Sequence, residues 1–123
     1  MEYQATFGID CGVSYGFGLK SPDYEKREEI VIADDNMNAI IAATKKAIHF
    51  SRDYLSNPQN DFTTVTLLEL YDSKRGLINQ KEVLEKAGFT GIKRFEWSED
   101  KLVIKCHMLE HLLPVVFKSA PDK

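Results

Sequence analysis

The segment 9–14 (Ile-Asp-Cys-Gly-Val-Ser) carries residue types that could bind a metal ion or a phosphate. A carboxylate such as Asp10, placed at the end of a strand, can hold Mg²⁺ or one of its waters. The backbone amides that follow it can form a nest for an anion. Two more carboxylates, Glu69 and Asp72, stand at or just past the end of a predicted strand over Thr63–Tyr71. A fold that brings these groups to Asp10 would let them share a catalytic metal ion.

The stretch Gly8–Tyr15 resembles the phosphate-binding hairpin of the actin and heat-shock ATPase superfamily, and its Asp-x-Gly turn is similar to that of ribonuclease-H-like nucleases. The resemblance implies a Mg²⁺-dependent nuclease that uses Asp10 with Glu69 or Asp72. With 123 residues the chain is too short for a complete actin-like ATPase. A ribonuclease-H-like nuclease also needs a carboxylate on a C-terminal helix, and only Asp122 follows Glu110. The nuclease is therefore an alternative hypothesis.

Residues 107–111 (His-Met-Leu-Glu-His) match the H-x-x-E-H pattern of a class of zinc peptidases. That chemistry needs a helix, which places the two histidines on one face one turn apart. Val103–Met108 alternates as a strand does, which would separate His107 from His111. We therefore expect two incidental histidines, no metal site and no catalytic residue.

Basic and aromatic side chains favour the binding of a nucleotide-like molecule. The cations are Lys20, Lys26, Arg27, Lys45, Lys46 and Arg52, and the rings that could stack on a base are Tyr15, Tyr24, Tyr54, Phe62 and Trp97. An arginine bonds phosphate with two parallel N–H groups, and a base stacks on an aromatic ring. The predicted ligand-binding residues are Asp10, Tyr15, Arg27, Arg52, Tyr54 and Asn57. The arginines would neutralise phosphate, a tyrosine would stack, and Asn57 or Asp10 would bond to ribose or base edges.

The elements that must position these residues begin with a strand. Alternation places Tyr3, Ala5, Phe7 and Ile9 on one face and leaves Thr6, Gly8, Ser14, Gly16 and Gly18 on the other. We predict a strand over Tyr3–Asp10, a tight turn, and a second strand over Ser14–Lys20. A face of nearly bare backbone would let a ligand or another segment approach closely.

The rest of the chain predicts alternating strands and helices. Tyr24–Glu29 reads as a charged lead-in to a strand over Glu29–Ala33, and 34–36 (Asp-Asp-Asn) supplies N-cap residues. Apolar residues at helical spacing predict a long helix from Met37 to Leu55 that ends at 56–60. After the strand Thr63–Tyr71 come a turn, a short helix capped by Asn79 and stopped by Gly88, and a hairpin of Gly91–Trp97 with Lys101–Met108. The apolar tail Leu109–Phe117 is left undecided between strand and helix.

This order predicts one α+β domain over residues 1–123, with an antiparallel or mixed sheet, one long helix packed across it and a second short helix. The net charge of −3 gives no general attraction to long nucleic acid. We expect no signal peptide and no membrane-spanning segment. The cysteines, Cys11 and Cys106, are too few for a disulfide framework, so a reducing cytoplasm is expected.

The first half of the chain resembles the phage-encoded Thoeris anti-defence family. Members of this family are small proteins that sequester cyclic ADP-ribose-type immune signals. The likeness is carried by Thr6–Asp10 and Ser14–Gly18, the charged 24–29 segment and the long helix after it. It implies a non-enzymatic, homo-oligomeric binder of a nucleotide-derived signal, an anti-defence sponge in the host cytoplasm that needs no cofactor. The alternatives are the nuclease and a protein–protein interaction module without a small ligand.

Overall fold

The computed structural model describes residues 1–12, 23–56, 62–74, 76–92, 95–107 and 117–119. Along the chain the elements are β1 (Glu2–Gly12), β2 (Asp23–Ile32), α1 (Asn36–Leu55), β3 (Phe62–Asp72), β4 (Gly76–Leu77), α2 (Gln80–Lys86), β5 (Phe89–Ile92), β6 (Phe95–Ser98), β7 (Lys101–His107) and β8 (Phe117–Ser119). The predicted α+β class is confirmed.

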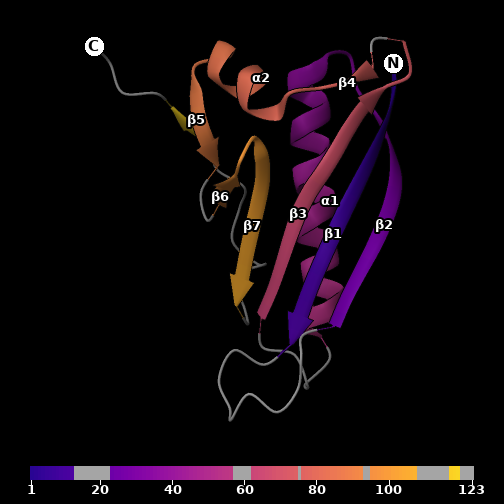
Figure 1. The fold of residues 1–123 in the computed structure, drawn as a ribbon, viewed down its shortest axis with the longest axis vertical. Helices are drawn as coiled ribbons and strands as arrows, with labels where there is room; N and C mark the ends of the chain where they lie inside the picture. The colour runs from indigo at the N-terminus through magenta and orange to yellow at the C-terminus, as the bar shows by residue number, and fades with distance from the viewer. Residues whose placement is uncertain (13–22, 57–61, 75, 93–94, 108–116, 120–123) are drawn as a thin grey trace.

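The main sheet is antiparallel throughout, with strand order β2-β1-β3-β7-β6 and with β4 paired to the end of β3. Helix α1 lies along one face of this sheet, behind β1 and β3 in Figure 1. Helix α2 packs near the start of α1 and beside β5 and β7. We call the sheet face away from α1 the open face.

Strand β1 forms the centre of the core. Tyr3, Ala5, Phe7 and Ile9 are all buried, as the alternation predicted, and they pack against the apolar side of α1. The expected turn at Asp10–Gly12 is wrong, because β1 continues through these residues and pairs Gly12 with Phe62. Cys11 is buried on the same side as Ile9, so the inward alternation extends the strand.

Strand β2 also differs from the prediction. It starts at Asp23 instead of Glu29 and occupies the second edge of β1, from Glu2↔Ile32 to Cys11↔Asp23. With β3 on the other edge, β1 has no edge left for the expected pairing with Ser14–Lys20, a segment that lies outside the described residues. The charged stretch 24–29 is compatible with a strand because β2 is an edge strand, where charged side chains reach water.

Helix α1 confirms the predicted long helix to within one residue. The Asp35 side chain accepts from the amide of Asn38 at 2.8 Å and caps the first turn. The buried side of the helix includes Ile40, Ala47 and Phe50. Within it, the Thr44 hydroxyl donates to the Ile40 carbonyl at 2.8 Å, so this buried polar group is satisfied.

Helix α2 is capped by Asn79 and followed by Gly88, both as predicted. The Asn79 side chain accepts from the amide of Glu82 at 3.0 Å, and Gly88 adopts a φ of 85°, which favours glycine. The first helical residue, Gln80, is buried between β3 and β7. Its Nε2 donates to the Leu67 carbonyl and its Oε1 accepts from the Leu102 amide.

The C-terminal third confirms the hairpin but changes its first strand. Strands β6 and β7 pair on either side of the turn at 99–100, from Phe95↔Ile104 to Ser98↔Lys101. The expected single strand Gly91–Trp97 is instead two strands, because β5 leaves the main sheet and pairs antiparallel with β8. The tail therefore contains strand at Phe117–Ser119, while 108–116 lie outside the described residues.

Candidate functional site

Arg27 stacks on an aromatic pair at the edge of the core. It lies half-buried on the α1 side of β2, opposite Phe7 of β1. Its Cζ lies 4.7 Å from the centroid of the Phe50 ring, and Phe50 meets Phe7 edge-on at 5.1 Å. Among the described residues no carboxylate forms an ion pair with Arg27. A guanidinium that packs over an aromatic face keeps N–H groups at its edge that can bond an anion.

Tyr54 is one helical turn beyond Phe50 and lies about 40° around the helix from it. It is half-buried and packs against the core. We call Arg27, Phe50 and Tyr54 the stacked-arginine cluster. Arg52 is exposed and lies about 160° around the helix from Phe50, so the structure does not bring it to Arg27.

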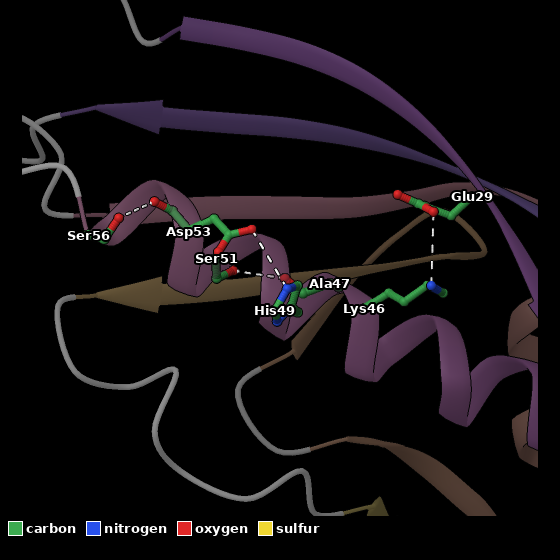
Figure 2. A network of polar contacts seen from close by, with 7 residues as sticks. All are labelled: Glu29, Lys46, Ala47, His49, Ser51, Asp53 and Ser56. Carbon is green, nitrogen blue, oxygen red and sulfur yellow. Dashed lines mark hydrogen bonds and ion pairs between the residues drawn. The ribbon is translucent and has the colours of Figure 1, made fainter.

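Lys46, one of the predicted cations, and other polar side chains of α1 make the contacts shown in Figure 2. The Lys46 Nζ lies 3.9 Å from Glu29 and joins α1 to β2. The His49 ring lies 3.8 Å from Asp53, and both side chains are mostly exposed. Glu25 and Glu29 lie two residues to either side of Arg27 on the same side of β2, and Lys46 lies within ion-pair distance of Glu29.

Asp10 lies on the open face, away from the stacked-arginine cluster. It is half-buried between Tyr24 and Thr64 in register, and strand alternation puts it on the opposite side of the sheet from Phe7. Gly8, from the predicted bare face, lies on the same side as Asp10. Tyr15 and Asn57, the remaining predicted ligand residues, lie outside the described residues, as do Gly16 and Gly18.

The carboxylates of the nuclease hypothesis are not brought together. Glu69 pairs with Thr6, four residues along β1 from Asp10, a separation of about 13 Å. Asp72 is buried beside Tyr3, near the other end of β1. Within the described ranges no group of three His, Cys, Asp or Glu side chains could hold a metal ion. His107 is the last residue of strand β7, so it does not start the helix that the zinc pattern needs.

A cavity of about 680 Å³ lies between the start of α1, β4 and α2, apart from these residues. Its polar lining includes Asp34, Asp35 and Glu82. Lys86 also lines the cavity and pairs with Glu82, which leaves Asp34 and Asp35 as the carboxylates that repel phosphate, so this cavity does not suit the predicted ligand.

Sequence reasoning missed Phe50 as a partner of Arg27. The signal was present, because Ala43, Ala47, Phe50 and Tyr54 follow helical spacing. What the sequence lacked was the register of β2, which places Arg27 above that ring.

No helix among the described residues is long and apolar enough to cross a membrane. Compared with known proteins, the chain matches no family model, no curated protein and no solved structure.

Proposed function

We propose that this chain is a non-enzymatic binding protein that holds a phosphate-bearing, nucleotide-derived molecule at the stacked-arginine cluster. The observation that carries the proposal is Arg27, held 4.7 Å above Phe50 and without an ion-pair partner among the described residues. A preoriented guanidinium loses little conformational entropy when it binds phosphate. Tyr54, one turn away, adds a second aromatic side chain of α1 near the arginine.

Sequestration is favoured over turnover because the candidate carboxylates Asp10, Glu69 and Asp72 lie apart in the sheet. The resemblance to the Thoeris anti-defence family implies the ligand class, a cyclic ADP-ribose-like or cyclic nucleotide immune signal. It also implies a phage-encoded protein that acts as a homo-oligomer in the host cytoplasm. Binding at a half-buried site would remove the signal from its receptor by mass action.

The test is titration calorimetry and thermal shift with cyclic ADP-ribose isomers and cyclic di- and trinucleotides. Arg27→Met keeps the apolar stem but removes the charge, so we expect the affinity for the bound ligand to fall more than tenfold. Lys45→Met makes the same change of charge at an exposed position of α1 and should leave affinity unchanged. Arg52→Met tests the other predicted arginine. Because Arg52 lies outside the cluster, this variant should bind the ligand like the wild type. Circular dichroism checks that each variant is folded.

Equal affinity of Arg27→Met and the wild type would refute a ligand at this cluster. Chromatography of the denatured mixture gives the second readout. Ligand recovered intact supports sequestration, whereas ligand recovered cleaved would turn the assignment toward an enzyme, with Asp10→Asn as the first variant to examine.

A further inference from the structure

The large hydrophobic side chains that the described residues leave exposed gather at one end of the sheet. They are Met1, Ile30, Ile32, Tyr71 and Leu77. Ile32 is 78 % exposed, Leu77 66 % and Ile30 58 %. Single exposed apolar residues are ordinary, but a contiguous group marks an interaction surface.

The strand register places four residues of this region in one row across four strands. Gln4 of β1 has Ile30 on one side and Tyr71 on the other, and Tyr71 pairs in turn with Leu77. Cross-strand partners share a face, so the row lies on the open face, away from α1 in Figure 1. At about 4.8 Å between strands the row is about 14 Å long. We call it the apolar row.

Carboxylates border the apolar row on both sides. The next row toward the middle of the sheet is Glu28, Thr6 and Glu69. The next row in the other direction holds Glu2 beside Ile32. All three glutamates are exposed, and none forms an ion pair within the described ranges. Gln4 donates a hydrogen bond to Glu28 at 3.3 Å. The surface therefore combines exposed apolar side chains on either side of Gln4 with negative charge that no ion pair among the described residues neutralises.

The surface is also hollowed. A depression of about 360 Å³ is lined by Glu2, Tyr3, Gln4, Ile30, Tyr71 and Ser73. The depression has room for the apolar stem of a side chain, and a polar group at the tip of that side chain can bond to Gln4 or a carboxylate.

We infer that the apolar row with its acidic border docks an amphipathic helix of a partner protein, one with an apolar stripe flanked by lysine or arginine. The row matches the length of about three helical turns laid along it, and the apolar stripe would cover Ile30, Tyr71 and Leu77. Basic flanks would pair with Glu2, Glu28 and Glu69, which attract such a partner and fix its register. This surface is separate from the stacked-arginine cluster and does not depend on the proposed ligand.

The acidic border selects this occupant over others. A symmetric dimer through this face would bring the acidic borders of the two copies together, and like charges repel. Anionic membranes and nucleic acid are disfavoured for the same reason.

The experiment measures fluorescence anisotropy with a fluorescein-labelled 14-residue peptide that has leucine at helical spacing and lysine elsewhere. We expect saturable binding that weakens with added salt. Ile30→Ser should weaken it at least tenfold, and Glu69→Lys at least fivefold. Both substitutions change exposed side chains and should leave the fold intact. Glu85→Lys, an equal charge reversal at an exposed position of α2, is the matched control and should bind like the wild type.

A second peptide with glutamate in place of every lysine should fail to bind. Equal binding of the two peptides would overturn the inference, because it would show nonspecific apolar adhesion. No binding of the lysine peptide, or equal binding by Ile30→Ser, would overturn it as well. Sedimentation that shows a wild-type dimer lost in Ile30→Ser would assign the surface to a second copy instead. Nucleotide binding is also measured on Ile30→Ser and should equal that of the wild type, because Ile30 lies outside the stacked-arginine cluster. A failure of the docking inference can therefore be told apart from a failure of the proposed function.

Discussion

Replacement of Gln80 by alanine tests whether one buried amide joins two strands of the main sheet. The Gln80 Nε2 lies 2.7 Å from the Leu67 carbonyl, and its Oε1 lies 3.0 Å from the Leu102 amide nitrogen. The β3–β7 register ends one residue earlier, at Thr66↔Val103, so the side chain continues the connection where the backbone ladder stops. Gln80 is 2 % exposed, so alanine would leave a carbonyl and an amide without these partners in the core.

The expected loss follows from these two bonds. A buried backbone group that loses its partner costs about 1–3 kcal/mol, so two groups cost about 2–6 kcal/mol. Water that enters the space left by the side chain can recover part of this, so we expect the free energy of unfolding to fall by about 3 kcal/mol. A chain of 123 residues is typically stable by roughly 6–18 kcal/mol, so the variant should fold.

The assay is urea unfolding followed by circular dichroism and by Trp97 fluorescence. With a urea dependence of roughly 1–3 kcal/mol per molar, the midpoint should drop by roughly 1–3 M. Hydrogen exchange at the Leu102 amide should accelerate selectively. Glu85→Ala, at an exposed position of the same helix, should stay within about 0.5 kcal/mol of the wild type. A loss below about 1 kcal/mol in Gln80→Ala, or unchanged exchange at Leu102, would refute the bridging role.

Two further predictions concern helix α2. Asn79→Ala removes the acceptor of the Glu82 amide and should destabilise the protein by about 1 kcal/mol in urea, whereas Asn38→Ala, inside α1, should stabilise slightly because alanine is the better helix former. The hydrogen bond and charge of Lys86 lower the pKa of Glu82 from its ordinary 4.5, and those of Glu82 raise the pKa of Lys86 from 10.5. The stabilisation from ionised Glu82 is lost as the pH falls through its lowered pKa. The stabilisation from charged Lys86 is lost as the pH rises through its raised pKa. The deficit of Glu82→Gln in the urea midpoint should therefore be present near neutral pH and shrink both as the pH falls below 4.5 and as it rises above 10.5. A deficit independent of pH would contradict this.

The predicted site and the stacked-arginine cluster overlap only in part. Arg27 and Tyr54 lie in the stacked-arginine cluster, whereas Asp10 lies on the other sheet face and Arg52 on another side of α1. Residue types identified the groups able to bind phosphate, but they could not say which of them share a surface. That depends on which residues of each strand face the same side of the sheet and on the register between strands. An error of one residue in either moves a side chain to the opposite face.

The sequence by itself determined the features that depend on residues a few positions apart. These include the inward alternation of Tyr3, Phe7 and Ile9, the helical spacing of α1, and the caps at Asp35 and Asn79. Only the tertiary structure decided that β1 runs on past Asp10, because that required β2 and β3 to occupy its two edges. The same holds for the charged edge strand, the pairing of β5 with β8, and Gln80 between β3 and β7. Each of these depends on contacts between segments far apart in the chain, which local propensity and periodicity do not encode.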